Sequence, residues 1–254
     1  MQLNNKQITQ NNLSILIHKD GFSFCTSEQH HLFKLEDNPP TEESLNSWLK
    51  YHHLNQPNQK LIFLDQPAIT VPLPLFEESL AHQYLNSAQL KNNELHATFN
   101  KLVDLEQAIV FNVNTQWSEL FKKILPNAKH SHLVSELLPA LSNYSTGKAK
   151  RNLFIHLRKG AFDLFLYQGG QLLLQNSFPH LHADDFLYYL FYVTEQFYLK
   201  PEQFNLFFLG KYNQYDDYYA GVKEFHDSID FFDPQFSIID HQHPVPFFQT
   251  FSAE

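Results

Sequence analysis

Short hydrophobic runs separated by turn residues predict that the chain begins with strands. Leu13 to His18 and Phe22 to Cys25 are joined by Asp20-Gly21, a dipeptide that accepts the positive φ angles of a tight hairpin turn. A third run, His31 to Leu35, follows a short polar segment. The pattern predicts a three-stranded antiparallel meander in this part of the chain.

Helical periodicity follows the meander. Leu45, Trp48, Leu49 and His52 recur at i, i+3, i+4 and i+7, which predicts a helix with one buried face. Lys60 to Leu64 is a short apolar run of the kind that forms a strand inside a sheet.

The stretch from 66 to 100 is less regular and predicts an insertion or subdomain. Pro72 and Pro74 forbid a central strand there, and Phe76 to Leu85 has a helical pattern. Beyond it we expect a strand at Ala108 to Val113 and a helix at Trp117 to Ile124 that is ended by Pro126. A further helix is expected at Leu133 to Leu141, bent or broken near Pro139.

The second part of the chain repeats the order of the first. Three apolar runs separated by Arg158-Lys159-Gly160 and Gly169-Gly170 predict another meander. The expected strands are Leu153 to Leu157, Phe162 to Tyr167 and Leu172 to Phe178. Further expected elements are a helix at 183–199, a strand at Phe204 to Leu209, a helix at Tyr215 to His226 and a last strand at Phe236 to Ile239.

Two copies of one order of elements predict an α/β protein with mixed sheets, built from two similar halves. The expected first half is 1–148, with the insertion near 66–100, and the second is 149–254. With 254 residues and 43% hydrophobic residues, the chain can bury a large core without disulfides or metals.

Composition narrows the functional classes. Cys25 is the only cysteine, the sequence starts without the basic and apolar regions of a secretory signal, and no apolar run reaches about 18 residues. We therefore expect a cytoplasmic protein without a membrane span. The formal charge is −9 and there are only two arginines, which disfavours direct nucleic-acid binding. The one basic island is interpreted as solvated surface, with phosphate binding as the alternative: Lys148, Lys150, Arg151, Arg158 and Lys159.

Several segments together resemble a known family. They are Val71-Pro72, Leu75-Phe76, Tyr84-Leu85, Asn176-Ser177-Phe178, Asp185 to Leu190, Glu195-Gln196 and Phe208-Leu209-Gly210. They look like an uncharacterised bacterial family, domain of unknown function 3822, which is grouped with the actin-like ATPases. The resemblance implies two ribonuclease-H-like subdomains, each a β-meander followed by alternating helices and strands.

The resemblance also implies where a nucleotide would bind. Actin-like ATPases place an Asp at the end of the first strand of each half, followed closely by Gly, so that the carboxylate holds Mg²⁺ while the turn cradles phosphate. Asp20 and Gly21 match weakly in the first half. In the second half, Lys159 and Gly160 form the turn, but no carboxylate occurs before Asp163.

The adenosine-binding Gly-Gly of the superfamily is reduced here to one glycine followed by lysine, Gly210-Lys211. The nucleotide motifs are therefore degenerate, and we expect a non-catalytic protein that acts through protein–protein contacts. Exposed tyrosines in the second half would suit such an interface.

Two alternatives remain. One is an ATPase that binds Mg²⁺ and ATP in the cleft between the halves, using Asp20, Lys159 and Gly210. The other is a histidine metal site. The close histidine pairs are His130 with His132, His180 with His182 and His241 with His243, although their spacing matches no established metal motif. Partner identity and homodimer formation are not decided by the sequence.

Overall fold

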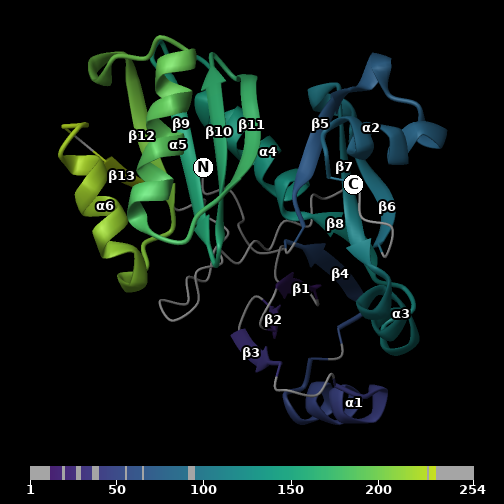
Figure 1. The fold of residues 1–254 in the computed structure, drawn as a ribbon. Coiled ribbons are helices and arrows are strands. Elements are labelled where there is room, and N and C mark those ends of the chain that lie inside the picture. The colour runs from purple at the N-terminus through teal and green to yellow at the C-terminus, as the bar shows by residue number, and fades with distance from the viewer. Residues whose placement is uncertain are drawn as a thin grey trace, which may run out of the picture. The chain divides into compact units, whose positions relative to one another are not determined.

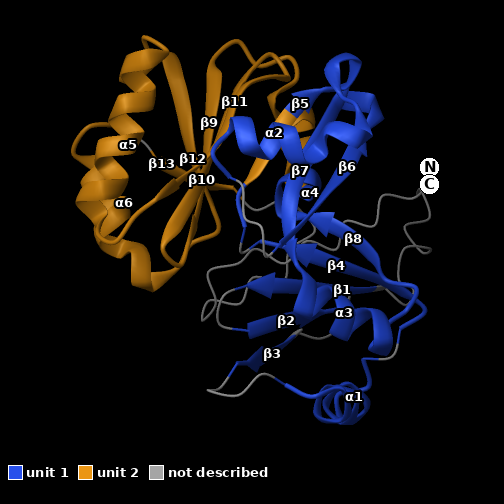
Figure 2. Cartoon of the chain, turned by 45° about the vertical axis from the view of Figure 1, so that its right-hand side comes forward, with its two compact units in different colours: residues 1–67, 71–136, 247–254 blue, residues 68–70, 137–246 orange. Residues whose placement is uncertain are grey.

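The computed structural model describes residues 12–18, 21–26, 30–35, 40–54, 56–64, 66–90, 95–227 and 229–232. The chain divides into two compact units, shown in different colours in Figure 2. Unit 1 comprises 1–67, 71–136 and 247–254, and unit 2 comprises 68–70 and 137–246. Each unit is described by itself below.

Unit 1 contains a five-stranded mixed sheet in the order β3-β2-β1-β4-β8. β1 (Asn12–His18), β2 (Gly21–Cys25) and β3 (His30–Lys34) form the antiparallel meander. β4 (Asn58–Phe63) and β8 (Lys129–His132) extend the sheet in parallel. The predicted meander is therefore confirmed.

Two helices pack on the face of this sheet that carries Phe22 and Phe24. α1 (Glu42–Tyr51) begins at a capping box of Thr41 and Ser44 and contacts Phe24 through Trp48. α3 (Thr115–Ile124) contacts Phe22 through Trp117 and Phe121. The two α3 pairs are edge-to-face and the α1 pair is tilted. Aromatic pairs of this kind stabilise packing beyond the burial of apolar area, so they anchor both helices.

The irregular stretch forms a small sheet of its own, in the order β5-β7-β6. Its elements are β5 (Ala68–Pro72), η1 (Leu73–Leu75), η2 (Glu78–Leu80), α2 (Ala81–Ser87), β6 (Leu95–Leu102), η3 (Val103–Leu105) and β7 (Gln107–Asn114). Pro72 ends an edge strand, where a missing N–H costs no ladder bond. The predicted helix at 76–85 is replaced by a 3₁₀ turn and the shorter α2.

Unit 2 repeats the arrangement with the strand order β11-β10-β9-β12-β13 (Figure 1). Its strands are β9 (Arg151–Arg158), β10 (Ala161–Gln168), β11 (Gln171–Pro179), β12 (Phe204–Leu209) and β13 (Ile229–Phe232). β9 to β11 form the second predicted meander, and β12 is parallel to β9.

Helices cover both faces of the unit 2 sheet. Two helices, α5 (Ala183–Gln196) and α6 (Asp216–Lys223), lie side by side on one face (Figure 1). The short 3₁₀ helix η4 (Pro201–Gln203) follows α5, and η5 (Asn213–Tyr215) precedes α6. The side chains of α5 and α6 bury Ile155, Leu157 and Phe162 in the main core of the unit. On the opposite face, the part of α4 (Leu133–Ser145) that belongs to unit 2 contacts Phe154 through Tyr144.

Another local prediction differs from the structure, because α4 continues through Pro139 instead of breaking there. The strand predicted at 108–113 is confirmed as β7, which belongs to the small sheet, whereas β8 takes the outer position of the main sheet. The predicted strand Phe236 to Ile239 lies outside the described residues. No helix among the described residues is long and apolar enough to cross a membrane.

Candidate functional site

The hairpin between β9 and β10 is the part of unit 2 where the resemblance implies a phosphate-binding turn. Lys159 and Gly160 form the turn, and Gly160 has a φ of 76°, in the region that favours glycine. Lys159 and Gly160 are exposed. Behind the turn, Arg158 lies opposite Ala161 in the ladder. The backbone requirement of a tight turn therefore accounts for Gly160.

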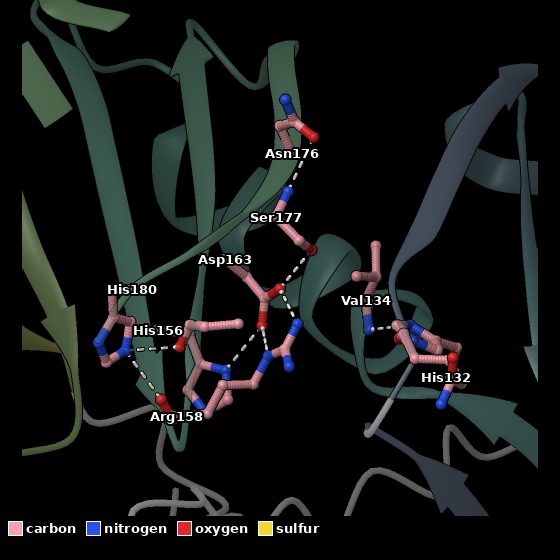
Figure 3. Close-up of polar contacts among 10 residues, drawn as sticks. His132, Val134, His156, Arg158, Asp163, Asn176, Ser177 and His180 are labelled. Atoms are coloured by element: carbon pink, nitrogen blue, oxygen red, sulfur yellow. Dashed lines mark hydrogen bonds and ion pairs between the residues drawn. The ribbon is translucent and has the colours of Figure 1, made fainter. Parts of the chain in front are cut away.

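Asp163 is the carboxylate nearest to this turn along β10, and it is surrounded by donors (Figure 3). The Arg158 guanidinium donates from Nε to Oδ2 at 2.9 Å and from Nη2 to Oδ1 at 3.1 Å. His156 Nδ1 lies 3.1 Å from Oδ2, and Ser177 Oγ donates to Oδ1 at 2.5 Å. We call Asp163, Arg158, His156 and Ser177 the Asp163 quartet.

The Asp163 quartet contains a buried ion pair between Asp163 and Arg158, and both carboxylate oxygens of Asp163 accept hydrogen bonds. Asp163 is 3% exposed and Arg158 is 8% exposed. Burial alone would raise the pKa of Asp163, but the charge of Arg158 and the hydrogen bonds from His156 and Arg158 hold that pKa far below its ordinary range. The carboxylate is thus ionised but already neutralised by the chain itself, which leaves it unsuited to bind Mg²⁺.

The quartet corrects the interpretation of the basic island. Arg158 was grouped with solvated surface charges, yet it is buried and paired. Because β-strand side chains alternate, Arg158 and His156 share one face of β9, where they meet Asp163 on β10. The spacing of these three residues around a hairpin was the signal that could have revealed the cluster.

His180 fixes the same turn from another side. Its Nε2 lies 3.0 Å from the Arg158 carbonyl oxygen and 3.1 Å from that of Ala161, so Nε2 carries the proton and donates. The Tyr218 hydroxyl then donates to Nδ1, at 2.9 Å. Burial lowers the pKa of His180. This histidine therefore serves as a neutral crosslink between the turn and α6.

Gly210 directly follows β12, which runs parallel to β9 with Phe208 opposite Ile155. It therefore lies at the same edge of the sheet as the Lys159-Gly160 turn. Gly210 has a φ of 85°, and a Cβ there would overlap the side chain of Tyr212. Tyr212 is 2% exposed. The close approach that a glycine permits is used here by the chain's own tyrosine ring.

The two first-half candidates have a different status. Asp20 lies outside the described residues. Gly21 is the first residue of β2 and belongs to unit 1, where a Cβ on it would overlap the carbonyl oxygen of Phe33 in β3. Close packing between two strands therefore accounts for this glycine. The structure brings Lys159, Gly160 and Gly210 to one sheet edge, all within unit 2.

A second polar cluster, in unit 1, was not anticipated from the sequence. Lys60 on β4 pairs with Glu136 at 3.0 Å, and both side chains are largely buried. Asn100 on β6 accepts from the His132 backbone N–H at 3.0 Å and from Ser135 Oγ at 2.9 Å. These bonds join β4, β6 and β8 to the first turn of α4. Sequence separations of 30 to 76 residues leave no local pattern that would reveal such contacts.

The metal hypothesis finds no support among the described residues, where no group of three or more His, Cys, Asp or Glu side chains could hold an ion. His132 accepts from the Val134 backbone N–H at Nδ1 and donates from Nε2 to the Gln66 carbonyl oxygen. His180 is bonded as above, and Asp185 accepts from the backbone N–H groups of Leu181 and His182. His241 and His243 lie outside the described residues.

The outer side of α5 carries exposed aromatic residues. Asp184, Tyr188, Tyr192 and Glu195 follow one another at helical spacing and are all exposed. We call these four residues the tyrosine face. Tyr188 is 65% exposed and Tyr192 is 49% exposed, whereas Phe186 and Leu190 on the opposite side are buried.

Comparison with solved structures identifies the fold. A Bacteroides thetaiotaomicron protein with an actin-like ATPase fold and unknown function matches with a TM-score of 0.77 and 21% identity, over 92% of this chain and 95% of that one. A chain of the PilM-PilN type IV pilus biogenesis complex matches with a TM-score of 0.50 and 10% identity, over 89% of both chains. No curated protein matches.

The chain therefore has the actin-like ATPase fold, as the resemblance implied. It belongs to the family described as Protein of unknown function (DUF3822), whose model matches residues 1–229.

Proposed function

We propose that this protein acts by binding another protein and that its nucleotide machinery is degenerate. The observation that carries the proposal is the Asp163 quartet. A Mg²⁺-nucleotide site needs carboxylate oxygens that are open to the metal or its waters, because hard cations take oxygen ligands. At Asp163, both oxygens accept from Arg158, whose fixed positive charge repels a divalent cation.

Two further contacts support the loss of nucleotide binding. Tyr212 packs where the resemblance implies the adenosine side of the site, against Gly210. The carbonyl oxygens of Arg158 and Ala161 bond to His180, which holds the turn in one conformation. The turn is thus stabilised by the chain's own side chains and does not depend on a phosphate for its order.

If the actin-like fold is kept without nucleotide binding, its exposed surfaces are the parts that can carry a function. Tyrosine is enriched at protein interfaces because its ring buries a large area at a small entropic cost. The tyrosine face is an exposed surface of this composition, which supports a protein as the partner. We place the interaction in the cytoplasm, since the only cysteine, Cys25, is buried and forms no disulfide within the chain.

Affinity capture from native cells tests the proposal. The full-length protein is recovered under two conditions, with EDTA and with Mg²⁺ and ATP, and bound proteins are quantified by mass spectrometry against an untagged control. We expect one partner retained in near-equal amount under both conditions. Recovery of no specific protein under either condition, or retention that requires Mg²⁺ and ATP, would contradict the proposal.

A further inference from the structure

Two partly exposed rings elsewhere in unit 2 have a lysine over them, whereas the rings of the tyrosine face do not. Lys148 Nζ lies 5.2 Å from the ring centroid of Tyr144, and Lys211 Nζ lies 5.4 Å from that of Phe231. Both of those rings are only 37% exposed. Among the described residues, no lysine or arginine lies over Tyr188 or Tyr192, although both rings are more exposed.

The charge around these rings defines what kind of group would complement them. α5 contains three acids and no lysine or arginine, and two of the acids, Asp184 and Glu195, belong to the tyrosine face. An electron-rich ring next to carboxylates attracts a cation, since the ring quadrupole and the acid act in the same direction. The described part of the chain places no lysine or arginine over these two rings.

This charge selects among the classes of occupant. Nucleic acid and anionic lipid surfaces are negative and are repelled by the acids of α5. A second copy that paired α5 with α5 in antiparallel fashion would place Asp184 opposite Glu195, two like charges. A protein segment that carries lysine or arginine satisfies both the carboxylates and the rings.

The length and ends of the surface indicate the form of the segment. A 14-residue helix such as α5 is about 21 Å long. Leu181 just before it is 83% exposed and Tyr198 just after it is 89% exposed, so apolar surface borders both ends. A complementary segment of four helical turns would combine basic residues with a few apolar ones.

We propose that the tyrosine face of α5 is the docking surface for a Lys/Arg-rich amphipathic segment of a partner protein, whose cations lie over Tyr188 and Tyr192. The inference rests on the proposed function and adds to it the place of contact and the chemistry of the partner. Binding is electrostatic in part, so it weakens as salt increases.

Two synthetic 18-residue amphipathic peptides serve as probes. The first is made of leucine and lysine, and the second has glutamate in place of every lysine. Fluorescence anisotropy measures their binding to the full chain at low and high salt. We expect the lysine peptide to bind more tightly and the variants Y188A/Y192A and D184N/E195Q each to weaken it about tenfold. Equal binding of the two peptides would overturn the inference.

Matched control variants separate a specific surface from the overall negative charge. E42Q/E43Q removes two exposed acids from α1, and Y51A removes a tyrosine that is 78% exposed. We expect both to bind the lysine peptide as the wild type does. If they weaken binding as much as the α5 variants, the peptide is attracted by net charge alone and the inference fails.

Photo-crosslinking in native cells distinguishes failure of the inference from failure of the proposed function. Benzoylphenylalanine replaces Tyr192 in one chain and Tyr51 in another. Crosslinking from position 192 to a basic segment of a partner supports the inference. Crosslinking of a partner only from position 51, or of a second copy from position 192, overturns the docking surface but leaves a protein-binding function. No partner from either position, together with no captured protein, rejects both.

Discussion

Arg158 and Asp163 form a two-bond ion pair across the β9–β10 hairpin, with Nε and Nη2 donating to separate carboxylate oxygens. The first strand of this half, β9, where the resemblance implies an open acid, carries no carboxylate, and Asp163 on β10 is the nearest one to the turn. Charge, hydrogen bonds and burial in unit 2 therefore all oppose metal coordination by Asp163.

Asp163→Asn removes the negative charge and leaves the Arg158 guanidinium buried without a counter-charge. We expect a loss of about 3–5 kcal/mol in the free energy of unfolding, because breaking a buried pair strands the remaining ion. Urea denaturation followed by circular dichroism measures this. The control is Glu78→Gln, which breaks the exposed pair with Lys101 and should change stability by about 1 kcal/mol or less. Equal effects would show that Asp163 is solvated.

The same pair predicts a dependence on acid. The folded-state pKa of Asp163 lies below the ordinary value of 3.8, so the unfolded chain takes up a proton on this group before the folded chain does. The stability that the carboxylate contributes is present above pH 4 and is lost as pH falls further. The difference in unfolding free energy between wild type and D163N should begin to shrink as pH falls from 4.5 to 3 and should continue to shrink at lower pH, because the folded-state pKa lies far below its ordinary range. A constant difference over that range would contradict the pairing.

His180 predicts a second pH effect, at higher pH. Its pKa is lowered from 6.5 mainly by burial. At pH values between the lowered pKa of the folded chain and the ordinary pKa of the unfolded chain, the unfolded chain binds a proton that the folded chain excludes. Stability therefore falls as pH decreases from 7 to about 5. His180→Gln keeps a donor for the turn carbonyls and removes this titration, which should flatten the curve. Parallel curves for wild type and variant would exclude His180 as the source.

Gly210→Ala tests the contact with Tyr212. Alanine at a φ of 85° is strained, and its Cβ would also overlap the tyrosine side chain. Gly147→Ala is the matched control, because Gly147 has a φ of 71° but no atom within 4 Å of a built Cβ. We expect G147A to cost about 1 kcal/mol, from backbone strain alone, and G210A to cost more. Thermal unfolding compares them, and equal losses would show that Tyr212 moves aside.

Tyr198→Gly tests whether the left-handed backbone conformation of Tyr198 lowers the stability of the folded chain. Tyr198 follows α5 with a φ of 51°, a position where glycine is favoured, and the Leu199 backbone N–H donates back to the Thr194 carbonyl oxygen. We expect glycine to stabilise the protein by about 0.5–1 kcal/mol. A decrease in melting temperature would instead show that the tyrosine ring makes a stabilising contact.

Both meanders and the buried faces of the helices could be predicted from the sequence because they depend on local periodicity and turn residues. β8 could not, since Lys129, His130 and His132 carry no apolar pattern, and its place depends on pairing with β4. Pro139 also misled, because it falls in a helix whose other residues are mostly apolar and buried, and this packing outweighs the lost hydrogen bond.

The candidate site could be predicted only in part for a similar reason. The turn residues Lys159 and Gly160 follow from the hairpin pattern. The state of Asp163 does not, because it depends on three side chains from β9 and β11 converging on one carboxylate. Likewise, the sequence around Gly21 and Gly210 indicates only a degenerate motif. The folded chain shows why each is glycine, since Phe33 lies close to Gly21 and Tyr212 lies close to Gly210.

We propose that unit 2 holds no Mg²⁺-nucleotide site. Thermal-shift measurements on the full chain with Mg²⁺ and ATP or ADP, against Mg²⁺ alone and salt of equal ionic strength, test it most directly. A ligand at about 100 times its Kd adds about 2.7 kcal/mol of stability. We expect the same melting temperature with nucleotide as in the controls. A Mg²⁺-dependent increase that saturates with ATP concentration would contradict it.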